Sequence, residues 1–325
     1  MQERIIKKMI EAMHLRKGDK VLLNGWCEET DTGMKLFENC LKETGAFVYP
    51  VTFTDGYLTE LVRDHPDGLK EEWFAPFSDT TAVIDLMEKP AGLPPEGLPR
   101  DSYPAFGQVL RSLFQFVSRH KKLIQITVPT RTNAMLAGQP YEKYRARMLK
   151  ALDIDYQALE KACRSRIREY PGDRRVIRTG KDCVLEMYTA GREWQIDAGE
   201  GSFPCGEIYI APEEEKTNGR IFFETLDLDG EKIFRNVTVT VRDGRVTESD
   251  CAELMRFLAG QEEGADIVGE LGIGMNPNVE EVLGDSQVDE ISLGTFHIAL
   301  GMNNLFGGKN CCRFHKDFVT QGEII

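Results

Sequence analysis

The stretch that decides the fold is KGDKVLLNGWCEETDTGMKLFENCLKETGAFVYPVTF, residues 17–53. It contains a short apolar run, then apolar residues at helical spacing, and then a second short apolar run. Two more short apolar runs, at residues 81–87 and 123–129, are separated by stretches that can be helical. Alternation of this kind predicts a parallel sheet flanked by helices in roughly the first 130 residues.

The pattern changes after a long charged segment at residues 140–170, whose apolar residues have the spacing of one or two helices. The Pro-Gly-Asp sequence at 171–173 ends this segment as a turn. Farther on, runs rich in β-branched and aromatic residues are punctuated by Asp-Gly pairs at 229–230 and 243–244. This second pattern predicts antiparallel hairpins.

We therefore expect an α/β fold with two domains. Residues 1–170 should form an N-terminal parallel-sheet α/β domain, and residues 171–325 a C-terminal α+β domain with largely antiparallel strands. The chain length of 325 residues agrees with two domains, at about 150 residues per domain. In the second domain we expect a helix at residues 250–258 and another that begins near Pro277, capped by Asn276.

The net charge limits the classes of partner. The chain has 53 acidic and 40 basic side chains and a formal charge of −13, which opposes non-specific attraction to nucleic acid or to an anionic membrane. No apolar run approaches the ~20 residues of a membrane-spanning helix. The N-terminal MQERIIKKMIEAM is typical of an amphipathic helix and not of a signal peptide. We expect a cytoplasmic protein whose partners are small molecules or other proteins.

The eight cysteines are scattered and include no C-x-x-C pair. This usage is typical of reduced, structural thiols, and it supports neither a zinc ribbon nor a thioredoxin-type pair. The adjacent Cys311 and Cys312 should point to opposite faces of a strand, so we interpret them as small structural residues.

The first candidate for metal binding is the sequence FHKDFV at residues 314–319. Strand alternation places His315 and Asp317 on one face, where an imidazole and a carboxylate can chelate a metal ion. The alternative is a hydrogen bond between the two side chains in solvent.

Two glutamates stand within or beside apolar runs. Glu270 lies within the glycine-broken sequence DIVGELGIGMNP, and burying its carboxylate costs several kcal/mol unless a cation or hydrogen-bond donors compensate. The alternative is a tight turn that leaves Glu270 in water, since glycines favour turns. Glu207 opens the apolar strand at 208–210, whereas the nearby Glu213–Glu215 are expected to form a solvated acidic turn.

His297 lies in the apolar sequence GTFHIALG. Taken alone, such a histidine is more typical of a satisfied core residue than of a metal ligand. Taken with the two glutamates, His315 and Asp317, it completes a ligand set that suits one or two divalent ions such as zinc, manganese or cobalt.

Four motifs together resemble those of the aminopeptidase T family of metallo-aminopeptidases, of the AmpS and PepS type. They are PCGEIYIAP (204–212), GELGIGMNP (269–277), HIALG (297–301) and HKD (315–317), and their order and approximate separations are those of the family. KGDKVLL near the start also resembles the family's opening strand. The resemblance spans essentially the whole chain and is specific in the C-terminal half.

The resemblance implies an α/β N-terminal domain, a C-terminal domain that binds two divalent ions of zinc, cobalt or manganese, and a homodimer. It implies five metal ligands: Glu207, Glu270, His297, His315 and Asp317. The implied reaction is removal of N-terminal residues from peptides, with a metal-activated water of pKa about 7. Glu207 or Glu270 would take the proton of this water or pass it to the leaving amine, and a metal or an acidic side chain would bind the substrate's α-amino group.

One position departs from the family. The peptidases carry a tyrosine seven residues after the first metal histidine, and this chain has Asn304 there. An amide can also donate a hydrogen bond to an oxyanion, so Asn304 joins Glu207 and Glu270 as a candidate catalytic residue. The segment between His297 and His315 is also shorter than in the peptidases.

Two other functions stay open. The chain also resembles 2,5-dihydroxypyridine dioxygenase of the same superfamily, an iron enzyme, and two histidines with one carboxylate form the facial ligand set of non-haem Fe(II) oxygenases. Glu207 and Glu270 would be surplus to such a mononuclear site. The third possibility is a metal-binding homologue without catalytic activity.

Overall fold

The computed structural model describes residues 1–27, 33–120, 122–228, 233–280, 282 and 286–325. The chain forms two compact units. The first contains residues 1–156 and 199–204, and the second contains residues 157–198 and 205–325. The helix at 156–167 lies almost entirely in the second unit, whereas the boundary expected from the sequence, at residue 170, assigns it to the first domain.

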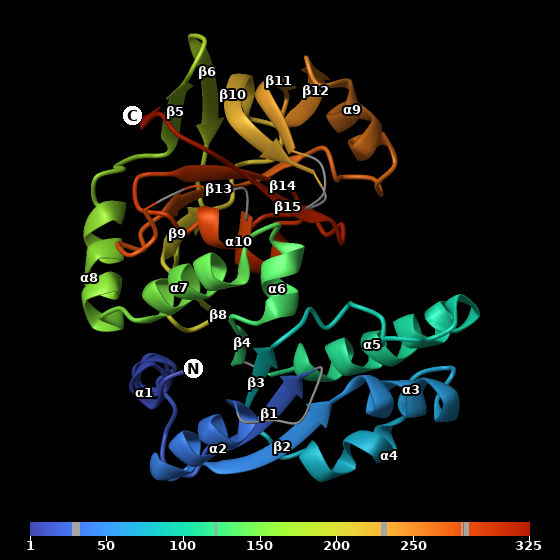
Figure 1. Cartoon of the computed structure of the whole chain (residues 1–325). Coiled ribbons are helices and arrows are strands. Elements are labelled where there is room, and N and C mark those ends of the chain that lie inside the picture. The colour runs from blue at the N-terminus through green and yellow to red at the C-terminus, as the bar shows by residue number, and fades with distance from the viewer. Residues whose placement is uncertain (28–32, 121, 229–232, 281, 283–285) are drawn as a thin grey trace. The chain divides into compact units, whose positions relative to one another are not determined.

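The first unit is built on a parallel sheet (Figure 1). The predicted parallel sheet is therefore confirmed, and its strand order is β2-β1-β3-β4-β8. The last strand was not predicted, because its two residues come from the segment that returns to this unit far along the chain. The strands are β1 (Lys20–Trp26), β2 (Phe47–Phe53), β3 (Ala82–Met87), β4 (Leu123–Thr127) and β8 (Ser202–Phe203).

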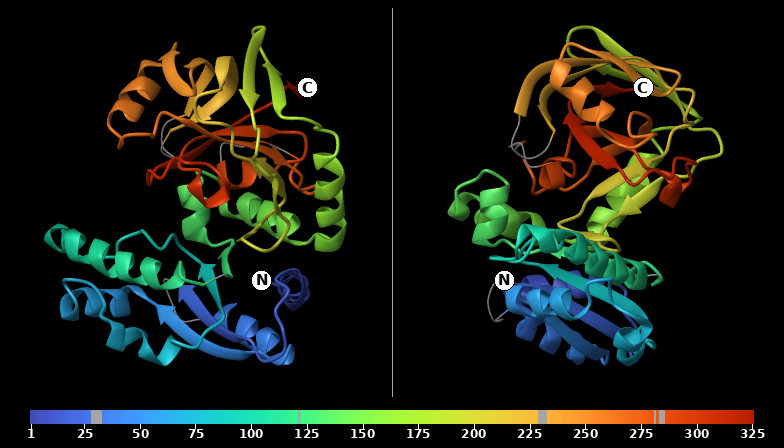
Figure 2. Two further views of the ribbon diagram at one scale, coloured as in Figure 1. Left: turned by 180° about the vertical axis from the view of Figure 1, so that it is seen from behind. Right: turned by 90° about the vertical axis from the view of Figure 1, so that its right-hand side faces the viewer.

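Helices cover both faces of this sheet (Figure 2). Side chains alternate along β1: Trp26 packs with apolar residues of α3 and α5, whereas Gly25 faces Met34 of α2. This is the layering expected of a parallel sheet with helical crossovers. The helices are α1 (Glu3–Ala12), α2 (Gly33–Glu43), α3 (Asp55–Asp64), α4 (Glu71–Phe74), η1 (Ala75–Phe77), η2 (Arg100–Ser102), α5 (Tyr103–Val117), α6 (Arg131–Leu136) and α7 (Tyr141–Leu152).

The second unit contains two antiparallel sheets. One has the order β12-β11-β10-β6-β5-β16, and its hairpin between β11 and β12 turns at Asp243 and Gly244, both of which have positive φ. The other predicted Asp-Gly turn, at 229–230, lies outside the described residues. The strands are β5 (Arg174–Thr179), β6 (Cys183–Tyr188), β10 (Asn218–Asp227), β11 (Ile233–Arg242), β12 (Arg245–Ser249) and β16 (Glu323–Ile324).

The other antiparallel sheet, which we call the site sheet, has the order β15-β14-β13-β9-β7. One of its faces packs on the first antiparallel sheet: the rings of Phe223 and Phe318 lie 6.0 Å apart, and Ile221 and Val239 contribute to the same apolar layer as Ile298. The opposite face is therefore the one available for chemistry. The strands are β7 (Gln195–Asp197), β9 (Glu207–Ile210), β13 (Val268–Gly274), β14 (Phe296–Gly301) and β15 (His315–Thr320).

The helices of the second unit are α8 (Tyr156–Ile167), α9 (Ala252–Ala259), α10 (Ser286–Asp289) and η3 (Asn304–Phe306). The predicted helix at Pro277 is wrong, since residues 277–278 form a turn. Its predicted cap, Asn276, is buried instead: its side-chain amide donates to the Cys205 carbonyl at 2.7 Å, and its oxygen accepts from the Asn278 N–H. The side chain that would cap a helix thus fixes a connection between strands.

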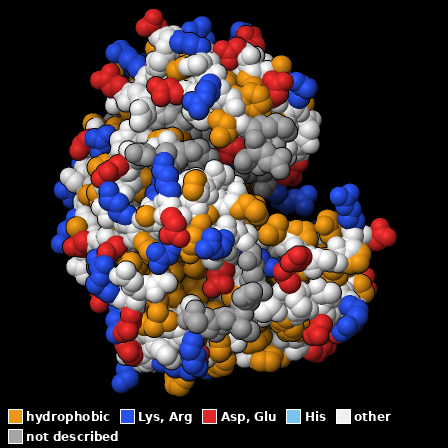
Figure 3. Space-filling model, viewed as in Figure 1, with side chains coloured by type: hydrophobic (Ala, Val, Ile, Leu, Met, Phe, Trp, Pro, Cys, Tyr) orange, Lys and Arg blue, Asp and Glu red, His pale blue; other side chains and the backbone are white. Residues whose placement is uncertain are grey.

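No helix among the described residues is long and apolar enough to cross a membrane. On the face shown in Figure 3, the acidic and basic side chains of the described residues are interspersed. All eight cysteines are free thiols, as predicted, and only Cys311 is exposed while Cys312 is half-buried.

Candidate metal centre

The site sheet brings all five predicted metal ligands to one face. On antiparallel strands, residues directly opposite each other point to the same face, and so do residues two apart on one strand. The ligands come from four adjacent strands, β9, β13, β14 and β15. The register aligns Glu207 with Gly274, His297 with Gly272, Glu270 with Ala299, Asp317 with Ala299, and His315 with Gly301.

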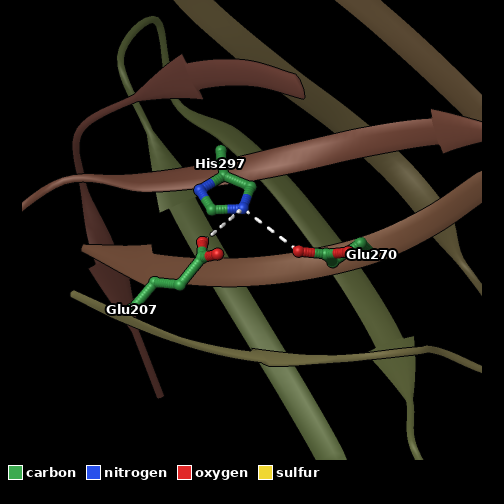
Figure 4. Close-up of side chains that lie close together, drawn as sticks. All are labelled: Glu207, Glu270 and His297. Atoms are coloured by element: carbon green, nitrogen blue, oxygen red, sulfur yellow. Dashed lines mark hydrogen bonds and ion pairs between the residues drawn. The ribbon is translucent and has the colours of Figure 1, made fainter. Parts of the chain in front are cut away.

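His297 lies at the centre of this group and is almost fully buried. Its Nε2 atom is 3.2 Å from Glu270 Oε1 and 3.5 Å from Glu207 Oε2 (Figure 4). The same atom is 3.8 Å from Asp317 Oδ1. Glu207, Glu270 and His297 each offer one ligand atom, and these three atoms lie within 4.8 Å of one another, a spacing that can hold a metal ion.

His315 faces the same group from the neighbouring strand. Its Nε2 atom is 3.5 Å from Asp317 Oδ1 and 3.8 Å from Glu270 Oε2. Its Nδ1 atom lies 2.9 Å from the Met302 carbonyl oxygen. Because a carbonyl only accepts, Nδ1 carries the proton, and the Nε2 of the neutral ring is left with a lone pair for a metal.

Glycines make room for this arrangement. A Cβ atom on Gly272 would lie 2.0 Å from His297 Nε2, so the imidazole lies in space that only glycine leaves open. Gly274 similarly allows the Ser292 carbonyl to approach. The alternative of a tight turn around Glu270 is wrong, because residues 268–274 form a continuous buried strand in which Glu270 is 5% exposed.

Several ionisable side chains lie close together in the site, and their proximity and burial shift their pKa values. Burial raises the pKa of Glu207 to about 8. The charge of His297 opposes this rise, and the charge of Glu270 adds to it. Burial acts to lower the pKa of His297, but its hydrogen bond with Glu270 and the charge of Asp317 outweigh burial and raise it to about 10. His315 follows the same pattern, with Asp317 as its main partner, and its pKa rises to about 9.

The donor set fits divalent cations. A further carboxylate, Glu290, lines the same cavity, and burial followed by the charge of Asp317 raises its pKa well above the ordinary value. Four carboxylates, of Glu207, Glu270, Glu290 and Asp317, thus face two imidazoles, which supply at most two positive charges. Uncompensated carboxylates are costly in a buried site. Oxygen and imidazole ligands suit divalent ions of zinc, cobalt or manganese type.

The group surrounds a cavity of about 310 Å³. Two of its ionisable residues, Tyr209 and Glu290, were not predicted from the sequence. Tyr209 was within reach of sequence reasoning, since it lies two residues after Glu207 on the same strand face. Glu290 follows the short helix α10, and no local pattern marks it. The lining residues are Glu207, Tyr209, Glu270, Glu290, His297, Met302, Leu305, Phe306, His315 and Asp317.

The loop at residues 302–314 forms one wall of the cavity and is tied down by Glu214. Oε1 of Glu214 accepts from the Lys309 N–H at 2.6 Å and from the Asn303 amide at 3.2 Å. Oε2 pairs with Arg192 at 2.8 Å, and both side chains of that pair are largely buried. The expectation that this carboxylate belongs to a solvated acidic turn is therefore wrong for Glu214. Its carboxylate holds the loop that connects the two strands carrying His297 and His315.

Asn304 is exposed and is not among the described residues that line the cavity. Its backbone N–H donates to the Asn310 carbonyl at 3.2 Å, within the same loop. Its catalytic role thus stays a prediction. The other predicted site residues, by contrast, all line the cavity.

The chain is similar to known proteins in the sequence of its C-terminal half and in its fold. Residues 176–316 match the model of the thermophilic metalloprotease (M29) family. The structure is similar to AmpT from Thermus thermophilus, with a TM-score of 0.68 and 19% identity over 99% of this chain and 94% of that one. It is also similar to 2,5-dihydroxypyridine dioxygenase from Pseudomonas putida KT2440, with a TM-score of 0.63 and 13% identity over 99% and 92% of the two chains. No curated protein sequence matches the chain significantly.

We predict that Gly272→Ala disrupts the metal centre. Its Cβ would collide with Nε2 of His297, and disturbing the groups that orient a metal ligand typically costs about 10- to 100-fold in metal affinity. Metal analysis and isothermal titration with Zn²⁺ should show lost or much weaker binding. Gly107→Ala is the matched control, because nothing lies within 4 Å of a Cβ there. Normal zinc binding by Gly272→Ala would contradict the placement of His297.

We predict that the chelated protein loses stability as the pH rises from about 6.5 to about 10. Glu207, His297 and His315 have raised pKa values of about 8, 10 and 9. The folded state therefore keeps protons that the unfolded chain has already released, which favours folding at the lower pH. The measurement is the thermal midpoint in EDTA against pH.

A variant with both histidines changed to glutamine is the control and should show a shallower fall. Added Zn²⁺ should stabilise the wild type more as the pH rises, because metal ligands must be deprotonated to bind. A midpoint in EDTA that stays level or rises over this range would count against the assigned protonation.

Proposed function

We propose that the chain is a divergent member of the thermophilic metalloprotease (M29) family, whose model matches residues 176–316, and that it is a metal-dependent aminopeptidase that removes the N-terminal residue from peptides. The observation that carries this proposal is the convergence of three carboxylates and two imidazoles on one cavity, with His297 Nε2 within 3.8 Å of all three carboxylates. Five ligands of this kind are more than one tetrahedral ion requires.

Glu270 supports a site for two ions. One of its oxygens lies nearest His297 and the other nearest His315, at 3.2 and 3.8 Å. A carboxylate placed between two imidazoles in this way suits a ligand that two ions share. Glu207 would then complete the site on the His297 side, and Asp317, which lies within 4 Å of both imidazoles, would complete it on the other.

Divalent ions bound there would supply Lewis-acid polarisation of the scissile carbonyl and acidify water. The chain supplies the proton transfer. Glu207 has the more exposed carboxylate of the two candidate glutamates, with 15% of its side chain accessible against 6% for Glu270. We therefore assign Glu207 to accept the proton of the attacking water and to return it to the leaving amine.

Glu290 is the proposed anchor for the substrate's α-ammonium group. It lines the cavity, and it forms no hydrogen bond or ion pair with any part of the chain that the structure describes. Glu290 is half-buried. A carboxylate partly withdrawn from water without a hydrogen-bond donor is costly, and a substrate ammonium group would pair with it. An anchor for the α-ammonium group restricts cleavage to the first peptide bond, which is the definition of an aminopeptidase.

The dioxygenase alternative has less support. A mononuclear iron site of His297, His315 and Asp317 would leave two carboxylates beside His297 without a function. Glu207 and Glu270 both lie closer to His297 Nε2 than Asp317 does. A non-catalytic homologue is distinguished from the peptidase only by assay. The homodimer, the cytoplasmic location and the choice among zinc, cobalt and manganese are part of the same proposal.

The direct test is release of amino acids from short peptides by protein loaded with Zn²⁺, Co²⁺ or Mn²⁺. Peptides with a free N-terminus should be cleaved, and the same peptides with an acetylated N-terminus should not, because acetylation removes the charge that Glu290 would bind. EDTA should abolish cleavage. If metal binds and no peptide in the panel is cleaved, the peptidase proposal fails and the non-catalytic homologue gains.

Glu290→Gln is the matched variant for substrate recognition. Loss of an ammonium–carboxylate contact should raise KM about tenfold or more while kcat falls less. The change keeps the side-chain shape and removes only the charge. An unchanged KM would show that the α-ammonium group binds elsewhere.

A further inference from the structure

Tyr209 supplies the only hydroxyl among the described residues that line the cavity. It lies on β9 directly opposite Gly272, and Gly272 lies directly opposite His297 on the other side of β13. Tyr209 and His297 therefore point to the same face of the site sheet from either side of a glycine. Because Gly272 has no side chain, the space above it is left to these two rings.

Aromatic contacts fix the direction of the Tyr209 ring. Phe306 packs edge-on against it with a centroid distance of 5.3 Å, and against His315 with a centroid distance of 6.2 Å. Phe306 itself belongs to the loop that Glu214 ties down, and its N–H donates to the Asn303 carbonyl at 3.2 Å. The phenol is thus oriented by the same loop that positions His315.

The hydroxyl of Tyr209 is available. It makes no hydrogen bond within the described part of the chain, and the residue is half-buried at the cavity wall. A tyrosine is protonated at neutral pH, so it can donate a hydrogen bond. Asn304, the donor expected from sequence, is exposed and outside the set of lining residues.

Resting on the proposed peptidase function, we propose that the Tyr209 hydroxyl donates a hydrogen bond to the oxyanion of the tetrahedral intermediate. The water oxygen bonds to the carbonyl carbon while its proton passes to Glu207, and the π pair moves onto the carbonyl oxygen. Tyr209 stabilises that oxygen and keeps its own proton. When the C–N bond breaks, the pair re-forms the carbonyl and the proton on Glu207 passes to the leaving amine.

Two single variants compare the two donors directly. Removal of one oxyanion donor costs about a hundredfold in kcat, so Tyr209→Phe should lose about this factor with KM changed by less than about threefold. Phenylalanine keeps the ring that packs on Phe306, and metal content should stay at the wild-type level. Asn304→Ala should keep kcat within about threefold. Loss of kcat in Asn304→Ala with retention in Tyr209→Phe would overturn the inference.

A binding measurement separates this role from a structural one. An α-aminophosphonic acid carries a tetrahedral anion like that of the intermediate, whereas the free amino acid does not. Tyr209→Phe should weaken the phosphonate about tenfold or more and leave the free amino acid nearly unchanged. If wild type and variant bind the phosphonate equally well and the wild type still cleaves peptides, the inference on Tyr209 fails and the proposed peptidase function stands. A wild type that cleaves no peptide would overturn both.

Discussion

Repulsion among buried and half-buried carboxylates is the constraint on which the candidate metal centre depends. Glu207, Glu270, Glu290 and Asp317 share one cavity with only two imidazoles. Burial raises the pKa values of Glu207 and Glu290. The neighbouring carboxylates raise the pKa values of His297 and His315 against the effect of burial. Without cations, such a cluster therefore holds extra protons in the folded state. Divalent ions would replace those protons, so folding, protonation and metal binding form one linked equilibrium.

In the site sheet, glycines leave space for the ligands, and a loop held by Glu214 keeps them in position. Glycines at positions 272 and 274 leave room above β13 for His297 and for a neighbouring carbonyl. The loop at 302–314 connects the two histidine strands, and Glu214 holds it through the Lys309 N–H and the Asn303 amide. The opposite face of the sheet packs on an apolar layer, which fixes the strand register. Rigid strands therefore position the ligands, and one short loop closes the wall of the cavity.

Sequence patterns predicted what is local. Alternation placed His315 with Asp317 on one face and put Glu207 at the start of a strand, since both depend only on the period of two. Patterns failed where contacts with distant segments determine the role of a side chain. Asn276 binds the Cys205 carbonyl, 71 residues away, instead of capping a helix. Glu214 binds a loop that lies about 90 residues farther along the chain. Glu290 enters the site through tertiary packing alone. The family resemblance supplied the five ligands together, which local patterns could only suggest one at a time.

The central claim is that Glu270 and its neighbours hold two divalent ions in one cavity. The most direct measurement is anomalous scattering at the metal absorption edge from crystals of the zinc- or cobalt-loaded protein. We expect two peaks, one beside Nε2 of His297 and one beside Nε2 of His315, with Glu270 between them. A single peak that Glu207 and Glu270 do not contact, or metal bound away from this cavity, would contradict it.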